Sequence, residues 1–131
     1  MLLEKNKIEF LNCNLAAFEH HDGYAVRSQM TVGESLYMLR EDENRYDHNA
    51  IALFYAPKEM PEGVDSQDIT IAGKKLKAVH VGYIPANCNS ELAMLLDFGY
   101  GGIFECRISG ILPDEHPNQQ IRIRVNLLRK K

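Results

Sequence analysis

The sequence predicts a mainly β protein with one or two short helices, arranged as a small OB-like or SH3-like antiparallel β-barrel. Three observations lead to this class. The segment QIRIRVNL, residues 120–127, alternates apolar and polar residues, the period of a strand with one buried face. The run AIALFY, residues 50–55, is short, apolar and bounded by turn residues, which favours a buried strand. Only SELAMLLDFG, residues 90–99, has clear helical spacing, and short strands with a single helix favour a closed or partly closed sheet.

Length and composition indicate one globular domain. The chain has 131 residues, of which 45% are hydrophobic and 25% charged, and its formal net charge is −3. Any affinity for nucleic acid must therefore come from a local patch. The cysteines (Cys13, Cys88 and Cys106) form no CxxC pair, so reduced thiols are expected. No signal peptide or membrane-spanning run is recognisable, and we expect a cytoplasmic protein occupying residues 1–131, with its core at about 7–128.

In chain order, strands are expected at 7–18, 26–30, 35–40, 50–55, 76–84, 103–112 and 119–128. Residues 17–23, AFEHHDG, can add a second helical turn. An insertion loop is expected at about 56–74, because residues 56–75 are rich in proline, glycine and charge; a brief strand at 69–71 is possible.

The helix has recognisable ends. Asn87 or Asn89 can cap its start, because an asparagine side chain accepts bonds from unpaired backbone N–H groups. The leucines Leu92, Leu95 and Leu96 fall on one face, and Gly99 is a typical stop.

The segment LREDENRYDHNAIALFY, residues 39–55, concentrates acids and amides in one turn between two strands. One interpretation is structural, because Asn and Asp side chains bond their own backbone in turns. For Asn44 and Asn49 we favour that interpretation, and Arg40 with Glu41 can be an ordinary surface pair.

Three segments, AFEHHDG, LREDENRYDHNAI and VGYIP, occur in this order before the helix, and together they resemble the HIRAN family. The specific part is R-E-x-x-N-x-Y-D-x-N-A-I, carried by Arg40, Glu41, Asn44, Tyr46, Asp47, Asn49, Ala50 and Ile51. The ending HPNQQIRIRV is similar to free-standing bacterial members rather than to the domains fused to Rad5-like helicases such as the helicase-like transcription factor. The resemblance covers about residues 15–125.

The resemblance implies an OB-like barrel that captures 3′ ends of single-stranded DNA, without catalysis, as an accessory to DNA repair or stalled-fork processing. A separately encoded helicase or other repair protein is a possible partner. The residues it assigns to the 3′ end are Tyr46, Asp47, Tyr83, His20 and Asn44. A carboxylate accepts the hydrogen bond of a free 3′-hydroxyl and repels a phosphate, so Asp47 can separate ends from interiors. Tyr83 can stack on a base or be half-buried core, and both readings stay open. His20 and His21 stand where the family usually carries an aromatic pair.

The candidate phosphate contacts are basic residues from three segments: Arg45, Lys75, Lys77, Arg122 and Arg124. Such residues are often only a solvated face. No metal and no cofactor is expected, since HxxxH, CxxC, Walker A and GxSxG patterns are missing from the sequence. Two alternatives stay open: a protein–protein interaction module without DNA binding, and a magnesium-dependent nuclease built on Asp47 and His48.

Overall fold

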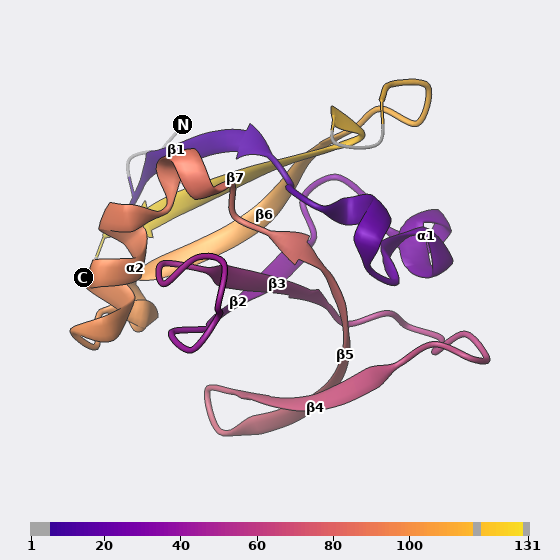
Figure 1. The fold of residues 1–131 in the computed structure, drawn as a ribbon, viewed down its shortest axis with the longest axis horizontal. Coiled ribbons are helices and arrows are strands. Elements are labelled where there is room, and N and C mark those ends of the chain that lie inside the picture. Colours follow the sequence, from indigo (N-terminus) through magenta and orange to yellow (C-terminus); the bar gives the residue numbers. More distant parts are fainter. Residues whose placement is uncertain (1–5, 117–118, 130–131) are drawn as a thin grey trace.

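The computed structural model describes residues 6–116 and 119–129. Over these residues the chain forms a seven-stranded sheet in the order β1-β7-β6-β2-β3-β5-β4, with every neighbouring pair antiparallel (Figure 1). The strands are β1 (Lys7–Asn14), β2 (Ser35–Arg40), β3 (Ile51–Tyr55), β4 (Ser66–Ile71), β5 (Lys74–Tyr83), β6 (Phe104–Ile111) and β7 (Ile121–Leu128).

Between the strands, the described residues form two α-helices and several short 3₁₀ turns. Helix α1 is Gly23–Val26 and helix α2 is Ser90–Asp97, and they lie at opposite ends of the view in Figure 1. The 3₁₀ turns are Phe18–His20, Arg27–Gln29, Ala86–Cys88 and Gly101–Ile103. The predicted strand at 26–30 is therefore wrong. Val26 ends α1 and packs fully buried in the core, so its apolar side chain marked a helix rather than a strand.

The mainly β, antiparallel class is confirmed, and the sheet is open, as in an open OB-like fold. Strand β1 ends at Asn14 rather than at Phe18. Beyond it, Ala16 and Tyr83 form an isolated bridge with reciprocal backbone bonds of 2.9 Å, linking the end of β1 to β5 across the opening. Gly82 makes this approach possible, because a Cβ there would collide with the Leu15 side chain and the Ala16 carbonyl. The partly closed form thus depends on one glycine.

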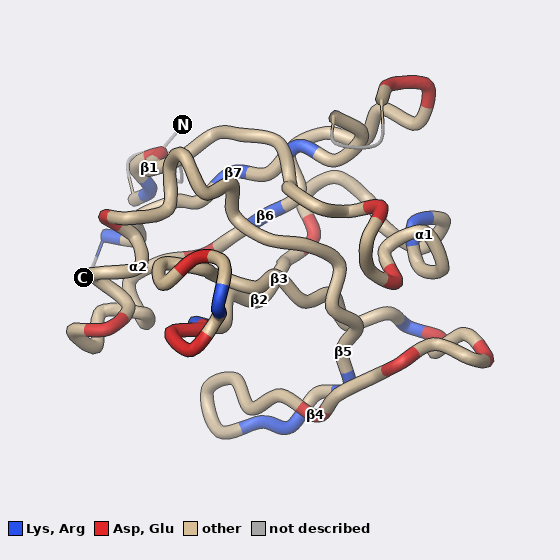
Figure 2. Tube along the Cα trace, in the orientation of Figure 1, with Lys and Arg blue, Asp and Glu red and all other residues tan. Residues whose placement is uncertain are grey.

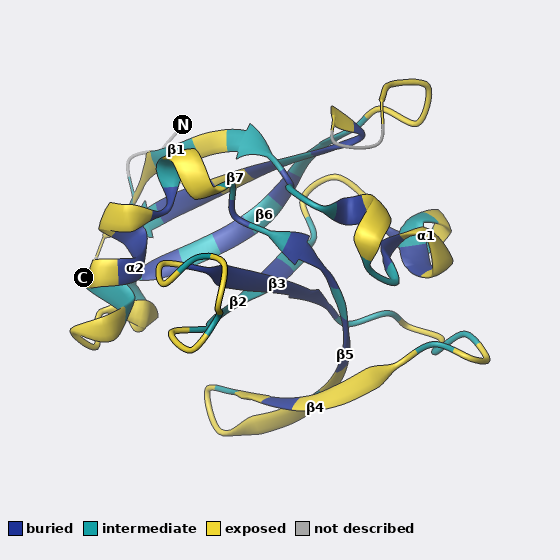
Figure 3. Cartoon of the chain, viewed as in Figure 1, coloured by how far each residue is buried: buried dark blue, intermediate teal, exposed yellow. Residues whose placement is uncertain are grey.

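The core has two parts, one on each face of β3. Ile51, Leu53 and Tyr55 point into the main cluster, whereas Ala52 and Phe54 point into a smaller one with Ile69 and Ala78. All five residues of β3 are buried, which confirms the prediction from its continuous apolar run (Figure 3). In β7 the predicted alternation holds for Ile121, Ile123 and Val125, which are buried, whereas towards its end Asn126 is buried and Leu127 is only partly buried.

The segment predicted as an insertion loop contains regular structure. Strand β4 lies within it and pairs with β5 from Ser66↔Val79 to Ile71↔Lys74, so the brief strand expected at 69–71 is longer. The β4–β5 hairpin projects from the body of the sheet and is mostly exposed (Figure 3). None of the helices in the described part of the chain has the length and apolar character needed to span a membrane.

Candidate nucleic-acid interface

The acidic turn between β2 and β3 is built by the side chain of Asn44. Its Oδ1 accepts hydrogen bonds from the backbone N–H groups of Tyr46 (2.9 Å) and Asp47 (3.1 Å). Its Nδ2 donates to Glu41 Oε1 (3.0 Å). The structural interpretation of Asn44 is therefore confirmed. These bonds fix the backbone that presents Tyr46 and Asp47.

Arg40, at the end of β2, holds the other side of the turn. Its guanidinium donates to the carbonyls of Ala50 (2.7 Å) and His48 (3.0 Å). The same group makes a bidentate pair with Asp97 at the end of α2, at 2.8 and 3.1 Å. The hydrogen bonds that Arg40 donates to Asp97 raise the pKa of Arg40 and lower the pKa of Asp97. The sequence suggested that Arg40 and Glu41 form an ordinary surface pair. In the structure Arg40 instead connects the turn to helix α2.

The carboxylate of Asp47 has a defined orientation. Oδ1 accepts the N–H of Asn49 (2.9 Å), and Oδ2 accepts the side-chain amide of Asn89 (2.8 Å). Asn89, one of the two predicted caps, occupies the N-cap position of α2, but its side chain makes no capping bond there. It is 1% exposed and donates to Asp47 instead. No sequence pattern indicated this role, because an asparagine before a helix is explained by capping alone.

A pocket of ≈ 280 Å³ lies between the turn and the end of β5. Its lining residues are Ala16, Asn44, Tyr46, Asp47, Ala50, Tyr83, Ile84 and Ala86. Tyr46 lies at the edge of the pocket and is 90% exposed. Tyr83 is half-buried, and its hydroxyl donates to Glu41 Oε1 (2.7 Å); burial and this bond raise its pKa to about 12. The structure thus brings four of the five predicted end-binding residues to one cavity.

The fifth, His20, does not line this pocket. It is exposed, with its Nε2 3.8 Å from Glu19 Oε1. Its neighbour His21 lies edge-on to Tyr83, with ring centroids 5.5 Å apart, and 4.0 Å from the ring of His80. Burial lowers the pKa of His80 and, together with the neighbouring histidines, that of His21. The ring beside the pocket is therefore His21, and it is joined by His80, which the sequence did not single out.

The predicted cations do not gather around the pocket. Arg45 lies near the pocket without lining it: it is exposed, and its guanidinium carbon is 5.9 Å from the centre of the Tyr46 ring. Lys75 and Lys77 lie in the β4–β5 hairpin opposite Thr70 and Asp68, and neither lines the pocket. Figure 2 shows the acidic character of the turn between β2 and β3. No lysine or arginine is among the described residues that line the pocket.

The two predicted arginines of β7 belong to other surroundings. Arg122 donates to the side chains of Asn14 (3.1 Å) and Asn12 (2.7 Å). Arg124 pairs with Glu9 at 3.0 Å and lines a separate hollow of ≈ 460 Å³ on the outer face of the sheet. Neither arginine lines the acidic pocket.

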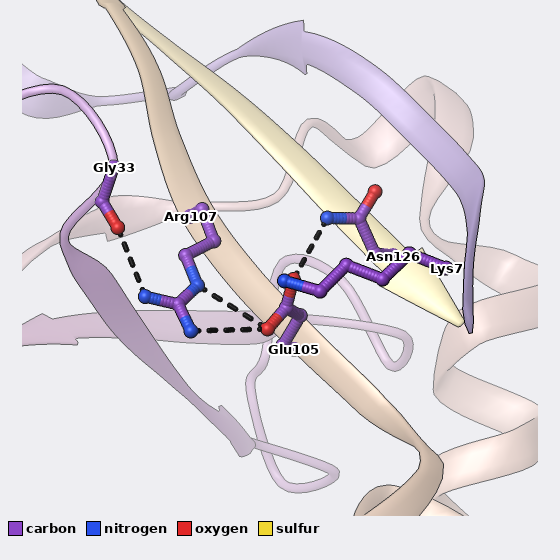
Figure 4. Close-up of polar contacts among 5 residues, drawn as sticks. All are labelled: Lys7, Gly33, Glu105, Arg107 and Asn126. Atoms are coloured by element: carbon purple, nitrogen blue, oxygen red, sulfur yellow. Dashed lines mark hydrogen bonds and ion pairs between the residues drawn. The ribbon is translucent and has the colours of Figure 1, made fainter. Parts of the chain in front are cut away.

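Glu105 joins two of the cations in that outer hollow (Figure 4). It pairs with Lys7 at 2.9 Å and Arg107 at 3.2 Å, and it accepts the amide of Asn126 at 2.9 Å. Burial alone would raise the pKa of Glu105, but these hydrogen bonds outweigh it and lower that pKa. The hollow is therefore a cluster of paired polar side chains, in which Glu105 is shared between Lys7 and Arg107.

Within residues 6–116 and 119–129, no three His, Cys, Asp or Glu side chains are grouped so as to hold a metal ion. Asp47 and His48 accordingly have no third candidate ligand among these residues. The chemistry available at the pocket is that of an oriented carboxylate beside two tyrosine rings, which suits a hydrogen-bond donor with an apolar or aromatic neighbour.

Comparisons with known proteins identify the family and the fold of the chain. The family model of the HIRAN domain matches residues 8–128. A crystal structure of a protein from Lactobacillus plantarum superposes with a TM-score of 0.61 at 17% identity, covering 95% of this chain and 97% of that one. The HIRAN domain of human HLTF superposes with a TM-score of 0.55 at 13% identity, covering 98% of this chain and 84% of that one. At these identities the two structures show a shared fold. No relative among curated proteins matches the chain.

Proposed function

The chain belongs to the HIRAN family, a family of nucleic-acid-binding rather than catalytic domains, and on that premise we propose that it captures the 3′-hydroxyl ends of single-stranded DNA. The terminal sugar would enter the pocket between the β2–β3 turn and the end of β5, with its 3′-hydroxyl donating to Asp47. Tyr46 and Tyr83 would stack against the terminal nucleotide. The domain would assist repair or stalled-fork processing by enzymes encoded separately.

One observation carries this proposal: the pocket combines an oriented carboxylate with two tyrosines and lacks lining cations. A continuing strand would place a phosphate against Asp47, and like charges repel. A terminal hydroxyl instead finds a charge-assisted acceptor, which is among the stronger hydrogen bonds in proteins. The exposed Tyr46 ring adds a stacking surface, and base–aromatic stacking is worth about 1–3 kcal/mol per base.

Fluorescence anisotropy with 5′-labelled oligonucleotides tests the proposal. We expect a 3′-hydroxyl strand to bind at least about tenfold more tightly than the same strand ending in 3′-phosphate. Asp47→Ala should remove that preference, and Tyr46→Ala should weaken binding of the 3′-hydroxyl strand, since Tyr46 is exposed and its loss leaves the core intact. Equal affinity for the two ends would refute end capture.

Protein binding is the second candidate, and a different surface favours it. The pairing of β2 with β6 is confined to Ser35↔Arg107 and Leu36↔Cys106. Beyond it, a groove of ≈ 570 Å³ is lined by apolar residues of β2, β6, α2 and the β4–β5 hairpin, with Glu105 as its charged member. Such a groove suits an apolar segment better than a phosphate backbone. If the wild-type protein binds neither oligonucleotide at low salt, DNA binding is excluded and protein binding remains as the candidate function.

A further inference from the structure

Helix α2 contacts the acidic turn between β2 and β3 through both of its ends, at Asn89 and at Asp97. Asp97 pairs with Arg40, whereas Asn89 reaches the carboxylate of Asp47 itself. Asn89 does not line the pocket and is 1% exposed, so a bound strand would not touch it. Its side chain also makes no capping bond to the helix whose first turn it precedes. An asparagine at this position ordinarily accepts backbone N–H bonds, so the loss of that contribution needs a reason.

We infer that Asn89 is a positioning residue, which orients the Asp47 carboxylate and so sets the preference of the pocket for a hydroxyl over a phosphate. This inference rests on the proposed function. The Asn49 N–H holds Oδ1 and the Asn89 amide holds Oδ2, so the plane of the Asp47 carboxylate is fixed. The orientation of this plane sets the direction of the lone pairs that remain free to accept a hydrogen bond. A hydroxyl acceptor held in place by packed neighbours loses little conformational freedom when the ligand arrives.

The Asn89 amide also matters because it carries no charge. An aspartate at this position would have nearly the same shape but would place a second carboxylate against Asp47. Two carboxylates in contact cannot both ionise readily, so one holds a proton at pH values where a lone carboxyl is ionised. An asparagine supplies the donor at every pH, and leaves Asp47 as the charged acceptor.

Three variants test the inference, each compared with wild type by anisotropy on matched 3′-hydroxyl and 3′-phosphate strands. Asn89→Ala should weaken 3′-hydroxyl binding about tenfold while changing 3′-phosphate binding little, so that the ratio of the two affinities falls. Asn87→Ala, at an exposed position two residues earlier, is the control and should leave both affinities unchanged. In an Asp47→Asn background, Asn89→Ala should have no further effect, because its action passes through that carboxylate.

Asn89→Asp provides a readout that a merely structural residue would not give. Its 3′-hydroxyl affinity should be low at pH 7.5 and should recover relative to wild type at pH 5, where a proton restores the donor to Asp47. A wild type with no preference for 3′-hydroxyl ends would refute the proposed function. A wild type with that preference, retained by folded Asn89→Ala and independent of pH in Asn89→Asp, would refute the role of Asn89 alone. Thermal melts and circular dichroism establish folding for each variant.

Discussion

Replacing Arg40 by lysine tests whether the turn between β2 and β3 is held by the hydrogen bonds of Arg40 to its carbonyls or by the ion pair of Arg40 with Asp97. The Arg40 side chain is 15% exposed and donates to two backbone carbonyls of the turn, whereas its partner Asp97 is 52% exposed. Lysine keeps the charge but loses the planar fork that reaches several acceptors at once. A hydrogen bond from a charged donor contributes about 1.5–3 kcal/mol, and lysine retains part of the set, so Arg40→Lys should lower the free energy of unfolding by about 2 kcal/mol.

Urea denaturation with Asp97→Ala as the matched variant separates the two contributions. A solvated ion pair contributes little, so Asp97→Ala should barely change the unfolding midpoint. For Arg40→Lys, the loss corresponds to a melting temperature lower by roughly 6–10 °C. Should Asp97→Ala destabilise the protein as much as Arg40→Lys, the ion pair would dominate, and the assignment of Arg40 to the turn carbonyls would fail.

Three further predictions concern the scaffold around the pocket. Gly82→Ala should lower the free energy of unfolding by about 3 kcal/mol in urea denaturation, because the added methyl collides with the chain that follows β1; an unchanged midpoint would contradict the bridge. The pKa values of His21 and His80 are lowered on folding, so the unfolded state takes up protons more readily below pH 6.5, and stability should fall on acidification from pH 7.5 to 5.5; in His80→Phe this fall should be smaller. Cys88 should react first with a thiol reagent at pH 8, whereas Cys106 is buried, which raises its pKa, and should react only on unfolding; mass spectrometry of labelled peptides gives the order.

Patterns that depend on neighbours in the sequence predicted most of the fold. The alternation in β7 and the apolar run of β3 each reflect a local period, and both strands lie where expected. The strand expected at 26–30 was wrong because a short run with one buried valine fits either class, and contact with the core decided it. The hairpin that includes β4 was predicted mostly as loop, since its residues are polar and its pairing with β5 is a tertiary fact.

The residues of the candidate site likewise fall into those that a sequence motif identified and those that only tertiary contacts reveal. The family motif identified Tyr46 and Asp47, and the structure brings them to one pocket with Tyr83. Asn89 is 42 residues away from Asp47 along the chain, and its position before a helix already had a sufficient local explanation. Convergence of the basic residues depends on strand order, and the order places Arg124 on the outer face, beside Glu9. What the sequence could not supply was therefore long-range geometry.

The distribution of cations leads to a prediction about salt. The net charge of the chain is −3, and none of the five predicted cations lines the pocket, although the Arg45 guanidinium carbon lies 5.9 Å from the centre of the Tyr46 ring. Each phosphate neutralised on a single strand contributes about −0.7 to the slope of log K against log salt, so we expect a slope near −1 rather than one of −3 or steeper. Arg45→Ala should flatten it further, with Lys75→Ala as the matched control that leaves it unchanged. A steep slope that survives Arg45→Ala would mean that the strand follows a basic surface away from Asp47, and that a hydroxyl acceptor is not the main source of affinity.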